Sequence, residues 1–184
     1  LCKDKLPDAI IRVFSSIGIS MPGYVIASGL MIFLAVNLKV LPVNYNKPGG
    51  WLMPMLTLAI YPTSYLTRLT RASILEVMNQ DYLRTERAKG MSEFVVVFIH
   101  ALKNSLIPVI TYLGPLTASI LTGGFVAESV FSVPGLGRYF VSSISSRDYT
   151  MIMGVTIFYS ALIVFMNLIC DILYKIVDPR IQLD

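Results

Sequence analysis

Charged residues are spaced so that four long apolar intervals divide the chain. Uncharged runs of 26, 20, 24 and 22 residues follow Arg12, Lys47, Lys103 and Asp148. About 20 residues of helix cross a hydrocarbon core of about 30 Å, and a charge at its centre costs about 2.5–3.5 kcal/mol. The pattern predicts four membrane-spanning helices in one all-α transmembrane domain covering residues 1–184, with spans at about 16–38, 52–74, 104–127 and 150–173.

Helix-breaking residues interrupt these intervals. Prolines fall at positions 22, 54, 62, 108 and 115, and a glycine pair occupies 123–124. A bilayer tolerates such breaks only where neighbouring helices or water satisfy the freed carbonyl groups. The spans are therefore predicted to be kinked and packed in a bundle. Two shorter apolar stretches, Phe94–Leu102 and Ser129–Gly137, have nine residues each and are too short to span.

The distribution of lysine and arginine predicts the orientation. If the four spans alternate and the first residue lies inside, eleven of the 15 basic residues fall on the cytoplasmic side and four outside. This is the bias expected of cytoplasmic loops, and it places both ends of the chain in the cytoplasm.

Composition supports a membrane protein and limits the alternatives. Of 184 residues, 55% are hydrophobic and 14% charged, values remote from those of a soluble domain. The net charge of +4 follows from topology, so we expect no nucleic-acid partner. Cys2 and Cys170 are far apart, with no second thiol or histidine at ligand spacing, and we expect neither a disulfide framework nor a metal site.

Most of the charge is concentrated in the inner connection, at about 76–103. Asp81 is placed as an N-cap, helix-forming residues continue to Lys89, and Gly90 has the character of a C′ residue. Ser92 can cap a second helix. Two short helices of mixed charge would form a rigid polar projection that suits a protein socket better than anionic lipid. A plain solvated loop, basic for reasons of topology, explains the same pattern equally well.

Three stretches of the chain, at 81–110, 128–138 and 171–180, together resemble one family, the membrane permeases of ABC importers, in the branch that serves oligopeptides, dipeptides and nickel. The first is DYLRTERAKGMSEFVVVFIHALKNSLIPVI, starting at Asp81, which is similar to the cytoplasmic "EAA" loop. The second is ESVFSVPGLGR from Glu128, and the third is DILYKIVDPR from Asp171. Together with their spacing they cover essentially the whole chain.

The resemblance implies a coupling helix that docks into a cleft of a cytoplasmic ATPase subunit. The matched contact residues are Arg84, Thr85, Glu86, Arg87, Ala88, Lys89, Gly90, Met91, Ser92 and Glu93. Two departures from the general pattern stand out. Arg84-Thr85-Glu86 replaces Glu-Ala-Ala, and His100 to Lys103 replaces Ile-x-Leu-Pro. The peptide and nickel branch resembles this chain's Arg-Thr-x-Arg-Ala-Lys-Gly, in which Glu86 occupies the position x and is the more unusual residue.

The family also implies an architecture and partners. Its permeases usually have six spans, so this chain corresponds to the last four of a type I ABC importer permease and is expected to be N-terminally truncated. The expected partners are a second homologous permease, two ATPase subunits or domains, an extracytoplasmic substrate-binding protein and the lipid bilayer. ATP and magnesium would be used by the partners, with no cofactor on this chain. The expected location is the bacterial or archaeal inner membrane.

A second candidate group lies near the outer interface: Glu128, Pro134, Gly135, Gly137 and Arg138. Glu128 is either a gate contact in the translocation path or a structural carboxylate paired with Arg138 or with nearby backbone amides. We favour the structural role, because this acid stands at the edge of its apolar run.

Other functional classes find less support. The chain has no paired membrane aspartates, no serine–histidine pair, no H-E-x-x-H motif and no P-loop, so we expect neither a protease nor an ATP-binding chain. His100 is the only histidine and is expected to be structural. A secondary transporter or channel is the main alternative, because broken helices and few charges suit both. A purely structural membrane subunit is a third possibility.

Overall fold

The computed structural model describes residues 6–121 and 124–177. Within these ranges every regular element is helical, which confirms the predicted all-α fold. The helices are α1 (Leu6–Ser20), α2 (Gly23–Leu30), η1 (Met31–Asn37), α3 (Leu52–Met78), α4 (Asp81–Ala88), α5 (Glu93–Val95), η2 (Val96–Ala101), α6 (Leu102–Ser105), α7 (Ile107–Leu121), α8 (Phe125–Val130), α9 (Leu136–Ser146) and α10 (Tyr149–Val177).

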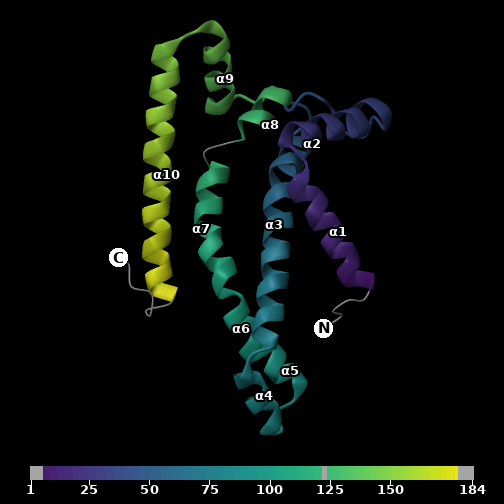
Figure 1. Cartoon of the computed structure of the whole chain (residues 1–184). Coiled ribbons are helices and arrows are strands. Elements are labelled where there is room, and N and C mark those ends of the chain that lie inside the picture. The colour runs from purple at the N-terminus through teal and green to yellow at the C-terminus, as the bar shows by residue number, and fades with distance from the viewer. Residues whose placement is uncertain (1–5, 122–123, 178–184) are drawn as a thin grey trace.

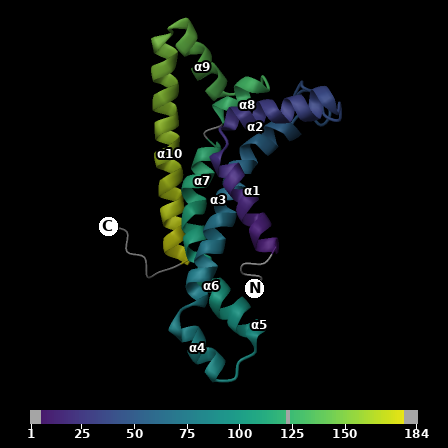
Figure 2. The same ribbon diagram turned by 45° about the vertical axis from the view of Figure 1, so that its right-hand side comes forward.

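Four helices form the body of the molecule (Figure 1). α10 packs on α7, α7 on α3, and α3 on α1. α8 and α9 lie at one end, whereas α4 and α5 project from the other, beyond the end of α3 (Figure 2). Along the chain α1 runs away from the α4–α5 end, α3 returns, α7 runs away and α10 returns (Figure 1). α1 therefore begins, and α10 ends, on the α4–α5 side.

The helices are less regular than four straight spans. Among the described residues, α10 alone is long and apolar enough to cross a membrane, through Tyr149–Ile169. Two bent pairs would also qualify if each counts as one span: Leu6–Ser20 with Gly23–Asn37, bent by 105°, and Glu93–Ser105 with Ile107–Thr117, bent by 40°. α3 has 27 residues, but hydroxyl side chains and two arginines dilute its apolar character. The limits of the four spans remain predictions.

Proline accounts for the sharper bend. Met21 N–H donates to the Ile17 carbonyl and ends α1, and the Pro22 carbonyl then accepts from Val25 and Ile26 to start α2. Pro22 itself is extended, with φ −59° and ψ 138°. A residue before proline is disfavoured in the α conformation, so the chain turns at this point.

Buried side chains gather at the two ends of α3. One cluster, Ala27, Met53, Ala127 and Phe131, joins α2, α3 and α8. The other, Val77, Leu83, Val96 and Ala101, joins α3, α4 and η2. Between them most apolar side chains are exposed, and only 6% of the apolar window of α10 is buried. Such a surface is expected in contact with lipid or with other membrane helices.

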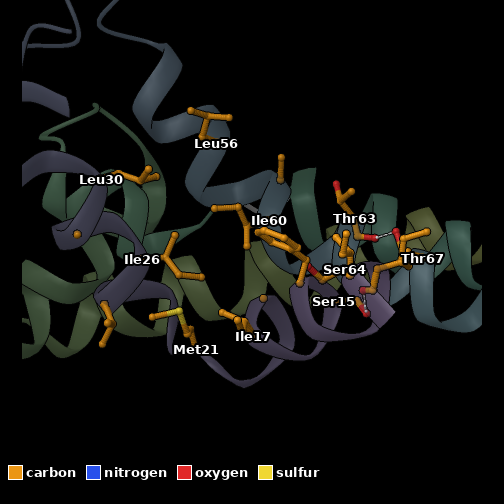
Figure 3. Close-up of a pocket in the computed structure, with 17 residues that line it drawn as sticks. Ser15, Ile17, Met21, Ile26, Leu30, Leu56, Ile60, Thr63, Ser64 and Thr67 are labelled. Carbon is orange, nitrogen blue, oxygen red and sulfur yellow. Dashed lines mark hydrogen bonds between the residues drawn. The ribbon is translucent and has the colours of Figure 1, made fainter. Parts of the chain in front are cut away.

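A largely apolar groove of about 690 Å³ runs between α1, α2 and α3 (Figure 3). Ile17, Ile26 and Ile60 line it, with Ser15 and Ser64 among its few polar residues. α1 and α3 approach so closely at Gly18, which also lines the groove, that a Cβ atom at this position would overlap the Ser64 hydroxyl. Glycine at position 18 thus sets the distance between α1 and α3.

Candidate functional site

The candidate site is the α4–α5 projection, hereafter the knob, comprising residues 79–101. Its anchor is Leu83, which is fully buried against Val77 of α3 and Val96 and Ala101 of η2. An isolated eight-residue helix is unstable in water, so this packing is what holds α4 in place. The predicted pair of short helices is confirmed.

A helix-terminating motif shapes the tip of the knob. Gly90 has φ +81°, its N–H donates to the Arg87 carbonyl at 3.0 Å, and Met91 N–H donates to the Glu86 carbonyl at 3.4 Å. These two bonds define a Schellman motif, and the C′ role predicted for Gly90 is confirmed.

The predicted capping residues have different outcomes. Ser92 is extended at the N-cap of α5, as predicted, although its side chain makes no capping hydrogen bond. Asp81 is not an N-cap: Gln80 holds that position with φ −77° and ψ 146°, and Asp81 is the first helical residue. At the first helical position the Asp81 carboxylate lies near the positive end of the helix dipole, which stabilises it. An acid is therefore suited both to the N-cap and to the first turn of a helix.

An ion pair closes the loop between α4 and α5. Arg87 Nε and Nη2 donate to the two oxygens of Glu93 at 3.1 and 3.0 Å. The hydrogen bond from Arg87 lowers the pKa of Glu93, and the same bond raises the pKa of Arg87. Because the Glu93 side chain is 62% exposed, the pair contributes geometry more than stability.

Glu86, the more unusual residue of the matched run, turns inward. Its side chain is 18% exposed, and Oε1 lies 3.4 Å from Nζ of Lys89. Oε2 is buried and has no hydrogen-bond partner among the described residues. Glu86 is therefore less accessible to a partner protein than its sequence position implies.

A polar contact ties the knob to the next membrane helix. The Tyr82 hydroxyl accepts a hydrogen bond from Asn104 Nδ2 at 2.8 Å and donates to the His100 carbonyl at 3.5 Å. Sequence reasoning missed this link, because residues 18 and 22 positions apart show no common pattern. Through it the knob is joined to the helix that leads into α7.

Most of the predicted contact residues lie on the knob surface. Arg87 and Glu86 are half-buried, and eight are exposed: Arg84, Thr85, Ala88, Lys89, Gly90, Met91, Ser92 and Glu93. Within the described part of the chain, Arg84 pairs only with Asp81, at 3.4 Å. The knob therefore presents both charge signs on a compact, hydrogen-bonded turn.

The outer candidate group forms a carboxylate-centred turn. Glu128 Oε2 accepts a hydrogen bond from Arg138 N–H at 3.0 Å, and Arg138 Nη1 donates to the Ser132 carbonyl at 3.1 Å. Gly135 and Gly137 make room for this carboxylate, since a Cβ atom on Gly135 would overlap it. The geometry matches the structural role favoured for Glu128, with the backbone amide of Arg138 as its partner. Pro134 lies exposed in the same turn.

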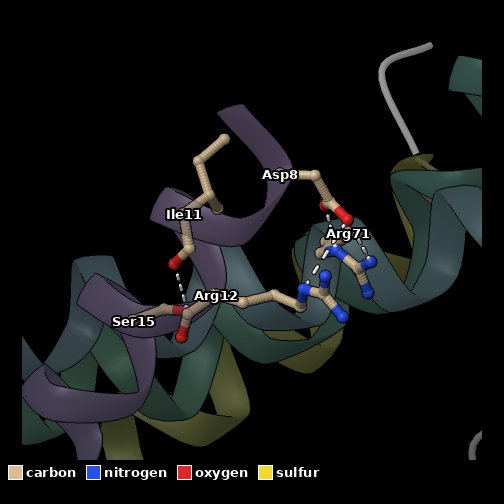
Figure 4. Close-up of polar contacts among 5 residues, drawn as sticks. All are labelled: Asp8, Ile11, Arg12, Ser15 and Arg71. Atoms are coloured by element: carbon tan, nitrogen blue, oxygen red, sulfur yellow. Dashed lines mark hydrogen bonds and ion pairs between the residues drawn. The ribbon is translucent and has the colours of Figure 1, made fainter. Parts of the chain in front are cut away.

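A second ion cluster, also missed, joins α1 to α3 (Figure 4). Arg71 Nε and Nη2 donate to the two oxygens of Asp8 at 2.5 and 2.7 Å, and Arg12 Nε lies 3.6 Å from the same carboxylate. The Asp8 side chain is only 12% exposed. Arg71 therefore holds the start of α1 against α3.

Comparisons with known proteins agree with these features. The family model for the binding-protein-dependent transport system inner membrane component matches residues 3–183. The dipeptide transport system permease protein DppB of Bacillus subtilis is 49% identical over 91% of this chain and 54% of its own length. DppB of Lactococcus lactis is 41% identical over 98% and 60%, and the oligopeptide transport system permease protein OppB of Haemophilus influenzae 39% over 95% and 58%. The chain thus spans little more than half the length of these relatives.

Proposed function

The chain belongs to the family of binding-protein-dependent transport system inner membrane components, and from this premise we propose that it is the coupling part of an ATP-driven peptide importer. In this role it lines part of the translocation path and receives the ATPase through the knob. The relatives described above are named for dipeptides or oligopeptides, which favours peptides over nickel chelates as cargo. A secondary transporter or channel is not favoured.

The observation that carries the proposal is the construction of the knob. It stands beyond the end of α3, is anchored by buried Leu83, and is tied to the helix before α7 through Tyr82. A displacement imposed on the knob therefore reaches both α3 and α7. This is the arrangement needed to convert movement of a cytoplasmic subunit into movement of membrane helices.

The run of the helices supports an orientation with the knob in the cytoplasm. α1 starts and α10 ends on the knob side, so both ends of this chain would be cytoplasmic (Figure 1). The basic residues of the knob and of the inner end of α3 then follow the positive-inside rule. The cell membrane of a bacterium or archaeon is the location we propose.

The proposed assembly contains a second homologous permease, two ATPase subunits or domains and an extracytoplasmic binding protein. The ATPases would bind ATP and magnesium, and this chain would have no catalytic residue. Its role is to hold the knob in the ATPase cleft by charge and shape. Mixed charge on the knob suits a protein partner with its own mixed charge.

Cysteine cross-linking tests the docking of the knob. In the complete transporter, cysteines placed at Ala88 or Ser92, both exposed, are expected to cross-link to cysteines in the ATPase cleft with a yield that changes on adding ATP. Ser142 of α9, exposed at the opposite end, is the matched control and should give no cross-link. Absence of any cross-link from the knob would refute the proposal.

A further inference from the structure

Three tyrosines and one arginine lie together on one face of the α3–α7 pair. The proposed function gives this face no role so far. Successive residues of an α-helix differ by about 100°, so Tyr61, Tyr65 and Arg68 fall within an arc of about 60° on α3. Tyr112 of α7 stacks against this face. Tyr61 is 46% exposed and Arg68 is also exposed, so neither α1 nor α7 covers them. These four residues are called the tyrosine–arginine site.

The rings form a continuous stack between α3 and α7. The centroids of Tyr65 and Tyr112 are 4.3 Å apart with an interplanar angle of 30°, and those of Tyr61 and Tyr65 are 6.3 Å apart at 25°. Along the chain, α3 leads into the knob, and α7 comes after the knob. The stack therefore bridges the two helices that the knob would move.

The polar atoms of the site are not used within the described part of the chain. The hydroxyls of Tyr61, Tyr65 and Tyr112 make no hydrogen bond there, and Arg68 has no ion pair there. Arg71, three residues later, instead holds Asp8 with two hydrogen bonds. Unpaired hydroxyl and guanidinium groups are costly against acyl chains, so this face is expected to meet water, a polar ligand or polar groups of a neighbouring helix.

The chemistry of the site selects for an anion with hydrogen-bond acceptors. Arginine contributes five N–H donors in a geometry that matches a carboxylate, and each phenol contributes an O–H donor. No acidic residue occurs between Leu52 and Leu75 or between Asn104 and Ala127, so neither helix offers a carboxylate here that could form an ion pair with an ammonium group. The aromatic faces add stacking surface for an apolar or planar group.

We propose that the tyrosine–arginine site binds the carboxyl-terminal end of a peptide in the translocation path. This inference rests on the proposed function of peptide import. Arg68 pairs with the free carboxylate, the tyrosine hydroxyls donate to peptide carbonyls, and the rings support the adjacent side chain. When the knob moves α3 relative to α7, the stack opens and the peptide is released.

The test uses the complete transporter with its binding protein, reconstituted in lipid vesicles. Uptake of radiolabelled alanine peptides of two to five residues is compared with uptake of the same peptides amidated at the carboxyl terminus. Arg68→Gln is expected to raise KM for the free acids about tenfold or more, and KM for the amides less than about twofold. Arg68→Lys should retain part of the preference for the acid. Tyr65→Phe, which removes one oxygen, should raise KM for the acids by a few fold.

Thr67→Val is the matched control beside Arg68. Its hydroxyl bonds the Thr63 carbonyl of its own helix, so its loss should leave both KM values unchanged. Equal effects of Arg68→Gln on acids and amides, or no effect together with no effect of Tyr65→Phe, would overturn the inference. If Arg68→Gln prevents assembly, the Tyr65→Phe result decides alone. Failure of the unaltered transporter to accumulate any of the peptides would instead refute the proposed function.

Discussion

Leu83 is the residue on which the knob depends most. Its side chain is fully buried, and it is the only residue of α4 that is buried, because the other seven are exposed or half-buried. Leu→Ala in such a site costs about 2–5 kcal/mol, and about 3 kcal/mol corresponds to a factor of roughly 100 in an equilibrium constant. Since α4 has only eight residues, it has little helical stability of its own to offset this loss.

We therefore expect Leu83→Ala to detach α4 from η2 and α3 while the membrane helices remain folded. Amide hydrogen exchange in residues 81–88 should accelerate by one to two orders of magnitude, with exchange in α10 unchanged. Stimulation of ATP hydrolysis by peptide-loaded binding protein should fall in parallel. Leu38→Ala, at a side chain that is 51% exposed, is the control and should change neither measurement. Unaltered exchange and unaltered stimulation in Leu83→Ala would refute the anchoring role.

Three further changes probe the knob and the contact between α1 and α3. Gly90→Ala should destabilise the knob by about 1–2 kcal/mol, because φ +81° is strained for alanine although its side chain would meet no atom, and hydrogen exchange of Met91 measures it. Protease resistance of the α4–α5 loop should be lost as the pH falls through the lowered pKa of Glu93. The pairing of Glu93 with Arg87 stabilises the loop fully above the ordinary glutamate pKa of about 4.3, and this stabilisation disappears when Glu93 is protonated. Gly18→Val should separate α1 from α3 and lower the thermal stability of the detergent-solubilised permease, and Ser64→Gly should restore part of it.

Each of these expectations has a matched comparison. Gly154→Ala introduces the same methyl group in open space within α10, without a positive φ, and should not destabilise the protein. Glu93→Gln should abolish the pH dependence of loop cleavage in the acidic range, and an unchanged profile would contradict the assignment. Gly154→Val is the matched control for Gly18→Val. If both variants left the thermal stability of the permease equally unchanged, the close contact between α1 and α3 would be contradicted.

Local signals made the knob predictable. Gly90 and Ser92 reveal a helix end and a helix start from sequence alone, because positive φ and extended N-caps have strong residue preferences. Asp81 was misplaced by one residue, since an acid favours both the cap and the first turn. Glu86 shows the limit of this reasoning, because its inward orientation depends on packing of the knob as a whole.

Long-range contacts explain what sequence did not reveal. Arg71 pairs with Asp8 across 63 positions of the sequence. No local pattern links two residues so far apart. Pro22 marked a break, but a proline does not specify whether the result is a mild kink or a bend of 105°. The partner of Glu128 was easier to foresee, because the backbone amide of Arg138 lies only ten residues further along the chain; its structural role remains a prediction.

Under the proposed function, ATP hydrolysis drives peptides across the membrane through this chain and its knob. The measurement that tests this coupling is the number of peptides accumulated per ATP hydrolysed by the complete transporter in sealed vesicles. It is made with the unaltered chain and with Arg87→Glu. We expect ATP-dependent accumulation for the unaltered chain and a marked fall in peptides per ATP when the Arg87 charge is reversed. Accumulation that does not depend on ATP, or an unchanged ratio in the variant, would contradict it.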